Sequence, residues 1–413
     1  MGFILQTSII FAVILGVALQ LVLKDPIWLA FGIGKTFQPL SEFPYSCRRI
    51  EDPRLQACED MWLSEATRQL FLACSDPLSR QQWMPNAHNF NASGRSTRDA
   101  VVALDIDSPK GGAFEFRTLS TPGFSGTAGD GLLQLVGLTG IDSPEGDKVE
   151  LLLVNNRPSV DPVTGEFLDQ AKVGANSTIE VFETGPQAVG MKHIRTFAGA
   201  NVSTPNNIAA LSSKAFYFTN DKGANKVGLI NFYATDTCQK SLISPLLGQG
   251  DISFCSASSG CKRVSERHRY PNGLVRGRDG LIYVPSAMAG GVQVYKVLPE
   301  DDRLQKVAEI PVPYSIDNLS VDGKGDIYAA VFPRGIEILQ AAKDPLNISP
   351  KSAAVRIRKE GEGEGVYVWE KVIEDGAGEV LPGSTVVVHD AKTGRLFFGG
   401  VVSPFIAVCE PKH

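Results

Sequence analysis

One unit recurs along this chain: an apolar strand, a polar turn and a second apolar strand. It occurs six times, at residues 58–74, 135–156, 205–221, 271–286, 316–331 and 383–402. A further segment of alternating apolar and polar residues follows each unit: VVALDI at 101, TIEVFE at 178, VGLINF at 227, VQVYKV at 292, IEILQ at 336 and FIAVCE at 405. Alternation at every second residue marks a strand with one buried face. The pattern therefore predicts six small antiparallel sheets.

Radial repetition of such sheets produces a β-propeller. We predict an all-β fold, a six-bladed β-propeller over residues 45–410 that follows a linker at 25–44. An irregular pair of β-sandwiches is the alternative. The repeat explains how 413 residues form one domain, since a chain of this length ordinarily has two or three. The net charge is −5 and no dense block of Lys or Arg occurs, so nucleic acid is not expected as a partner.

A propeller ring must be closed, and two cysteines stand at its ends. Cys409 lies in the last alternating segment and Cys47 lies just before the first unit. If the segment around Cys47 supplies the outer strand of the last blade, the two sulfurs meet, and we expect a disulfide between them. Cys58 and Cys74 flank the first hairpin and form a second candidate pair. Because the chain has seven cysteines, at least one stays free or pairs between chains.

The first strand of each blade lines the central tunnel of a propeller, so the residue that opens it faces one mouth of the tunnel. Four of the six units carry a carboxylate or amide at that position, and the full series is Glu59 with Asp60, Val136, Asn206 with Asn207, Asn272, Asp317 with Asn318, and Ser384. Oxygen ligands from several directions suit Ca²⁺ and suit zinc or copper poorly. The alternative explanation is that Asn and Asp only begin turns here.

The N-terminus and the sequons bear on the compartment. Residues 1–23 are almost wholly apolar, which suits a membrane span, a secretory signal peptide or a buried core helix. We take 1–24 as a signal peptide or signal-anchor, with membrane or lipid contact through 3–23. Sequons begin at Asn318 and at the four asparagines that we take as glycosylation sites, Asn91, Asn176, Asn201 and Asn347.

These sequons and the dispersed cysteines indicate the secretory pathway, with a secreted or membrane-anchored propeller that is lumenal or extracellular. One feature argues the other way. Basic residues follow the apolar run, at Lys24, Lys35, Arg48 and Arg49, and the positive-inside rule would keep that side cytosolic. We give more weight to the cysteines and sequons.

Several of these segments resemble the calcium-dependent serum paraoxonase/arylesterase family. They are CEDMWL, PNNIAAL, PNGLVRGRDGLIYV, DNLSVDGKGDIYAAV, PGSTVVV and the terminal AVC. The likeness runs from about Cys47 to Cys409. It implies a six-bladed propeller with two calcium ions in its tunnel and a closing disulfide. It also implies hydrolysis of lactones, aryl esters and some phosphotriesters.

Carried over by position, the resemblance assigns the oxygen-bearing residues to two calcium sites. The catalytic ion would be held by Glu59, Asn206, Asn272, Asp317 and Asn318. The deeper, structural ion would be held by Asp60, Asn207 and the backbone carbonyl of Leu138. The family usually has Asp at the position of Asn207, and the lost charge should weaken this second site.

The histidine dyad that the family uses as its proposed general base is missing, and its two positions hold Val136 and Asn156. Phe332 stands where the family has a further active-site histidine. If the chain hydrolyses esters, a carboxylate beside the metal must activate water. Glu59 and Asp317 are our catalytic candidates, and Asp221 is a further one.

We therefore expect a calcium-dependent hydrolase of small apolar lactones or aryl esters. Two alternatives stay open, because fold alone does not fix function. One is a non-hydrolytic enzyme of small-molecule biosynthesis, similar to the propellers that resemble strictosidine synthase. The other is a non-catalytic binding propeller that keeps calcium for stability.

Overall fold

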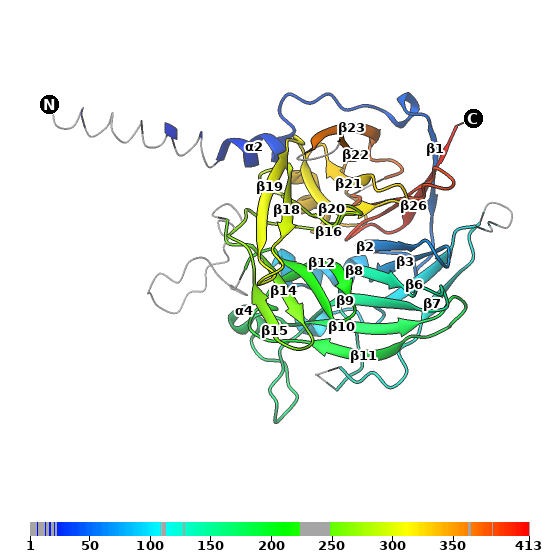
Figure 1. The fold of residues 1–413 in the computed structure, drawn as a ribbon, viewed down its shortest axis with the longest axis vertical. Coiled ribbons are helices and arrows are strands. Elements are labelled where there is room, and N and C mark those ends of the chain that lie inside the picture. The colour runs from blue at the N-terminus through cyan, green and yellow to red at the C-terminus, as the bar shows by residue number, and fades with distance from the viewer. Residues whose placement is uncertain are drawn as a thin grey trace.

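Six antiparallel sheets of four strands each are arranged around a common centre in the computed structural model of this chain (Figure 1). The first strands β2, β8, β12, β16 and β20 lie nearest to that centre in Figure 1, so the predicted six-bladed β-propeller is confirmed. The structure describes residues 23–107, 109, 113–126, 129–223, 248–361, 365–381 and 383–412, with Gln6, Val13, Gly16, Val17 and Gln20 before them.

The sheets follow one another along the chain. The first comprises β2 (Asp60–Ser64), β3 (Gln69–Cys74), β6 (Ala100–Asp105) and β7 (Phe116–Leu119). The second comprises β8 (Leu135–Asp142), β9 (Val149–Arg157), β10 (Asn176–Thr184) and β11 (Lys192–Phe197). The third comprises β12 (Pro205–Ser212), β13 (Ala215–Asn220), β14 (Asp251–Ser256) and β15 (Gly260–Arg263).

The remaining sheets continue this order until the last. The fourth comprises β16 (Val275–Arg276), β17 (Ile282–Pro285), β18 (Val292–Val297) and β19 (Leu304–Ile310). The fifth comprises β20 (Ser315–Val321), β21 (Ile327–Phe332), β22 (Ser352–Glu360) and β23 (Val366–Asp375). The sixth takes β24 (Val386–His389), β25 (Leu396–Gly399) and β26 (Ile406–Pro411) from the C-terminal end and β1 (Tyr45–Ile50) from the N-terminal end.

Two of the predicted third strands are wrong. Residues 336–340 belong to the helix α5 (Ile336–Ala341), and the third strand of the fifth sheet is β22. Apolar and polar residues alternate over only three positions there, and the Gln, Ala and Lys residues at 340–343 favour a helix. In the third sheet the third strand is β14, whereas the segment that begins at Val227 lies outside the described residues.

The ring closes through strand pairing and a disulfide. Strand β1 pairs antiparallel with β26, in a register that sets Cys47 opposite Cys409. The two sulfurs are bonded across a sequence separation of 362 residues. The predicted Cys58–Cys74 bond is also present. The third disulfide, Cys255–Cys261, was not predicted.

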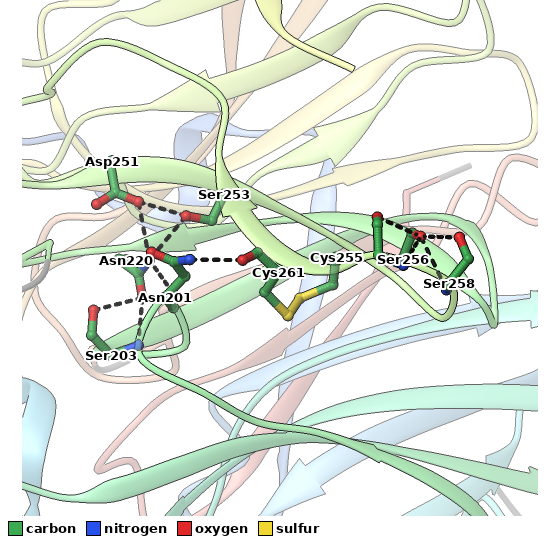
Figure 2. The surroundings of a disulfide bond; sticks show 10 residues. Asn201, Ser203, Asn220, Asp251, Ser253, Cys255, Ser256, Ser258 and Cys261 are labelled. Atoms are coloured by element: carbon green, nitrogen blue, oxygen red, sulfur yellow. Dashed lines mark hydrogen bonds between the residues drawn. A yellow bond between two sulfur atoms is a disulfide. The ribbon is translucent and has the colours of Figure 1, made fainter. Parts of the chain in front are cut away.

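The Cys255–Cys261 bond crosses from β14 to β15 (Figure 2). Beside it, the Asn201 side chain donates to the Cys261 carbonyl. The buried Asn220 accepts from the Ser203 backbone and donates to Asp251. These bonds fix the loop that leads into β12, whose first residues enter the tunnel.

Buried apolar side chains form one cluster at each of the six junctions between adjacent blades. Phe71 of β3 and Leu153 of β9, for example, share the cluster between the first two blades. Each sheet has a neighbouring sheet on both faces, so its inner strands are buried on both sides. In β9, for example, the consecutive residues Leu151–Val154 are all apolar. The clusters hold the blades, and therefore the first strands, in fixed places around the tunnel.

The residues before the propeller are partly described. Most of the predicted leader, residues 1–24, lies outside the described residues. Helix α2 (Lys24–Phe31) and the short helix η2 (Leu40–Glu42) occupy the predicted linker. The Leu29 carbonyl accepts from the Gly335 backbone, which ties α2 to the start of α5. No helix within the described ranges is both long and apolar enough to cross a membrane.

Candidate functional site

Three first strands contain a β-bulge near the tunnel end at which they begin. In each, two residues face one residue of the neighbouring strand; these pairs are Val136–Gly137 in β8, Asn206–Asn207 in β12 and Asp317–Asn318 in β20. A bulge breaks the regular alternation and redirects side chains. Two consecutive polar residues can thus enter the tunnel, where strict alternation would send one of them into the core.

Glycines let neighbouring first strands approach closely beside these bulges. A Cβ atom at Gly137 would lie 2.2 Å from the Asn206 carbonyl oxygen, and one at Gly273 would lie 2.2 Å from Asn318 Oδ1. Both distances are far below a normal contact. Any side chain at these positions would push the ligand-bearing strands apart.

The predicted ligands of the catalytic ion, Glu59, Asn206, Asn272, Asp317 and Asn318, lie at this end of the tunnel; we call them the upper site. Glu59 is 3% exposed, and its Oε1 accepts from Asn318 Nδ2 at 3.0 Å. Among the described residues, Glu59 Oε2, Asn206 Oδ1 and Asn272 Oδ1 are buried without any hydrogen-bond partner. Buried oxygens are ordinarily paired, and a hard cation requires unpaired ones. The upper site therefore fits Ca²⁺.

The predicted ligands of the structural ion, Asp60, Asn207 and Leu138, lie deeper in the tunnel; we call them the lower site. Asp60 Oδ2 accepts from the Leu138 backbone N–H at 2.7 Å. Asn207 Nδ2 donates to Asn318 Oδ1 at 3.0 Å, which links the two sites. A cavity of about 160 Å³ begins at the lower site and continues between the first strands toward the other end of the tunnel.

Three buried carboxylates dominate the electrostatics. Burial raises the pKa of Glu59 to about 7. Burial, and then the charge of Glu59, raise the pKa values of Asp60 and Asp317 well above their usual range. Acids placed this close together cannot all carry charge unless a positive charge joins them. A cation at the upper site would supply it.

Amides contribute as much to the site as carboxylates. Within the described parts of the chain, no three His, Cys, Asp or Glu side chains are grouped as metal ligands. The positions of the expected histidines hold other groups: Val136 and Phe332 are buried and apolar, and Asn156 is a buried amide.

An insertion between β3 and β6 lies across the upper end of the tunnel. It contains α3 (Pro77–Gln82), β4 (Trp83–Met84), η3 (Pro85–Ala87), β5 (Asn89–Phe90) and η4 (Ala92–Gly94). Trp83 Nε1 donates to the Asn156 carbonyl at 2.8 Å, and Asn86 Nδ2 donates to Asp221 Oδ2 at 2.7 Å. Lys222 Nζ donates to the Pro85 carbonyl at 3.2 Å. These bonds join the first blade to the second and third above the upper site.

Several residues near the upper site were not predicted from the sequence. Arg80 is 4% exposed and donates to the Leu135 carbonyl, and its charge opposes the rise in the pKa of Glu59. Thr385, one residue after the expected position Ser384, donates to the Glu59 carbonyl at 2.8 Å. Lys222 follows the candidate Asp221 directly, and burial lowers its pKa to about 8. No spacing or motif distinguishes these residues from ordinary surface positions.

A scan against family models matches the arylesterase model over residues 170–408, more than half of the chain. The chain belongs to the arylesterase family. This confirms the resemblance seen in the sequence. The matched region includes Asn206, Asn272, Asp317 and Asn318, and it ends one residue before Cys409.

Curated members of the arylesterase family match at moderate identity. Serum paraoxonase/arylesterase 1 of Mus musculus is 26% identical over 231 residues, which are 55% of this chain and 59% of that protein. Serum paraoxonase/lactonase 3 of Oryctolagus cuniculus is 28% identical over 233 residues, 54% and 59% of the two chains. The matched region thus spans about three-fifths of these relatives.

Among solved structures, a gluconolactonase from Xanthomonas campestris aligns with a TM-score of 0.46 and 11% identity, over 89% of each chain. A similarity this low does not bear on the function of the chain.

Proposed function

We propose that this chain is a calcium-dependent hydrolase of lactones or aryl esters. The observation that carries the proposal is the convergence of the unpartnered oxygens of Glu59, Asn206 and Asn272 at the end of the tunnel. Membership of the arylesterase family and the names of the relatives, arylesterase and lactonase, support the reaction class. The substrate class follows from this support: a small apolar ester or lactone.

The upper site would hold the calcium ion through Glu59, Asn206, Asn272, Asp317 and Asn318. When bound, the ion supplies a positive charge that polarises an ester carbonyl. The chain itself must orient water and accept its proton. Asn318 Nδ2 holds Glu59 Oε1, so the other oxygen of Glu59 stays directed into the site.

A carboxylate is the proton acceptor in this proposal. Glu59 and Asp317 both have raised pKa values, and a base works best when its pKa lies near the operating pH. Asp221 remains a further candidate, since its Oδ1 has no partner among the described residues while Asn86 holds its Oδ2.

The test is turnover of a chromogenic aryl ester and of a lactone panel by metal-stripped protein, with and without added calcium. We expect hydrolysis that appears with calcium and disappears with a chelator. Calcium binding without turnover of any ester or lactone would favour the biosynthetic or purely binding alternatives. Absence of calcium binding at millimolar metal would contradict the proposal at its base.

We expect calcium affinity to fall as the pH is lowered through about 7, because the pKa of Glu59 without metal is about 7. Above that pH the carboxylate is charged and free to bind. Below it the cation must displace a proton, so affinity drops by up to about tenfold per pH unit. Calorimetric titrations on either side of pH 7 measure this. An affinity independent of pH across that range would show that Glu59 is not a ligand.

We also propose that the propeller is lumenal or extracellular. Its three disulfides support an oxidising compartment. The sequon asparagines Asn91, Asn176, Asn201 and Asn347 are exposed, as glycosylation requires. Expression in a eukaryotic secretory host should yield a protein whose mass falls on glycosidase treatment, and a mass unchanged by the enzyme would contradict glycosylation.

Lipid contact through residues 3–23 stays part of the proposal. Trp28 and Phe31 on α2, which follows that segment in the chain, are 47% and 52% exposed, so the described protein presents apolar side chains next to the segment. Flotation of the full chain with liposomes tests this, and a chain without residues 1–23 is the control.

A further inference from the structure

Asn207 stands where the resemblance places a carboxylate ligand of a second calcium ion. Its side chain is 3% exposed and both of its polar atoms are occupied. Oδ1 accepts from the Ile208 backbone N–H at 2.6 Å, and Nδ2 donates to Asn318 Oδ1 at 3.0 Å. The amide orientation is fixed by these partners, because a flipped amide would set two N–H groups against each other.

Asp60 is occupied in the same way. Its Oδ1 accepts from the Met61 backbone N–H at 2.9 Å and its Oδ2 from the Leu138 backbone N–H at 2.7 Å. The Asn207 side chain also forms a hydrogen bond with Asp60. The Asn207 amide thus bridges Asp60 of the first blade and Asn318 of the fifth.

The two sites differ in one decisive respect. In the upper site three buried oxygens, from Glu59, Asn206 and Asn272, have no partner among the described residues. In the lower site no such side-chain oxygen of Asp60 or Asn207 is found in the described chain. Each side-chain oxygen of Asp60 and Asn207 already accepts a hydrogen bond, so a cation at the lower site would meet only the remaining lone pairs and a single formal negative charge.

The lower site is accessible from the tunnel, so inaccessibility to an ion does not distinguish it from the upper site. The cavity of about 160 Å³ reaches Asp60, Leu138 and Asn207 from the opposite end of the tunnel. That space is large enough for a hydrated ion to approach. What the lower site lacks is a second formal negative charge and free oxygens.

We propose that the Asn207 amide replaces the second cation, so that this chain binds a single calcium ion, at the upper site. The inference rests on the proposed function for that one ion. Hydrogen bonds of the Asn207 amide take the place of a metal ion at the lower site, because they hold the first and fifth blades to the third. Restoring a carboxylate at this position should create the second site, because it removes the two N–H donors and adds the missing charge.

The test counts calcium ions per chain by calorimetry and native mass spectrometry, on the full chain and on Asn207→Asp. We expect one ion for the natural chain and two for the variant. Gln305→Glu is the matched control: it adds the same charge at an exposed position of β19, and its count should stay at one. Thermal unfolding with and without calcium gives a second readout, since the Asp variant should gain more from the metal than the natural chain.

Asn207→Ala keeps the inference testable if the Asp variant does not fold. Removing the bridge should lower the melting temperature and leave the count at one. Two ions in the natural chain would overturn the inference while leaving the hydrolase intact. One ion in Asn207→Asp would also overturn it, and no ion in the natural chain would overturn both proposals.

Discussion

Glu59→Gln should lower the calcium-dependent hydrolysis of an aryl ester by about 100-fold or more and weaken calcium binding together with it. The substitution keeps the shape of the side chain and one oxygen, but it removes the charge that balances the cation. It also replaces Oε1 or Oε2 with an NH₂ group, either opposite Asn318 Nδ2 or directed into the site. Removing a single electrostatic contact at a developing charge typically costs two to three orders of magnitude in turnover.

The matched control is Glu180→Gln, which neutralises another fully buried glutamate. Glu180 is 0% exposed and binds Thr178, His193 and Thr196 within the second blade, away from the upper site. Its loss should reduce stability and leave the rate per folded molecule nearly unchanged. If both variants lose activity in proportion to their loss of folded protein, Glu59 has no specific part in the reaction.

The double variant Cys47→Ser, Cys409→Ser should lower the free energy of unfolding by roughly 6 kcal/mol in the chain-entropy model. The bond closes a loop of 362 residues, and in the chain-entropy model the stabilisation grows with the logarithm of loop length. The strand pairing of β1 with β26 remains, so the ring should still form in the absence of denaturant. Urea titration of calcium-loaded protein, followed by tryptophan fluorescence, measures the change.

The Cys255→Ser, Cys261→Ser variant is the natural comparison, because that bond spans only 6 residues. The same model gives it roughly 2 kcal/mol. Equal losses for the two variants would mean that loop entropy does not set the contribution of the closing bond.

The blades could be predicted because each follows from local pattern. A hairpin such as residues 135–156 has apolar strands on both sides of a Pro-Glu-Gly turn, and the structure places β8 and β9 there. Ring closure followed from topology, since the unmatched outer strand of the sixth blade had to come from the other end of the chain. The Cys47–Cys409 pair then followed from register.

Two third strands were predicted wrongly. In one case the local sequence pattern is ambiguous, and in the other a long connection separates the second strand from the third. Residues 336–338 alternate like a strand yet belong to α5, because three alternating positions do not distinguish a strand from a helical turn. The third strand of the third blade begins at Asp251, 31 residues after β13 ends at Asn220. The prediction therefore took the apolar segment that begins at Val227, which is nearer in sequence, as the strand that pairs with β13.

In the candidate site, too, some features could be predicted from the sequence and others could not. Repeat position predicted which polar residues gather at one end of the tunnel, since each opens the first strand of a blade. The bulges that bring both Asn206 and Asn207 into the tunnel were invisible, because a bulge is a property of strand pairing. The hydrogen bonds that distinguish the lower site from the upper depend on which groups of distant blades meet. Thr385, which precedes the first strand of the sixth blade, reaches the Glu59 carbonyl only because the ring is closed.

Ring closure by the two ends of the chain has a consequence for biosynthesis. On a ribosome, β1 emerges first and its partner β26 last, 362 residues later by the spacing of their bonded cysteines. At roughly 5–20 residues per second this interval is about 20 to 70 seconds. Throughout it Cys47 is without its partner, while Cys58 and Cys74 emerge soon after it. In the lumenal location proposed above, Cys47 could pair early with either of them, and such a bond would have to be exchanged before β26 could close the ring.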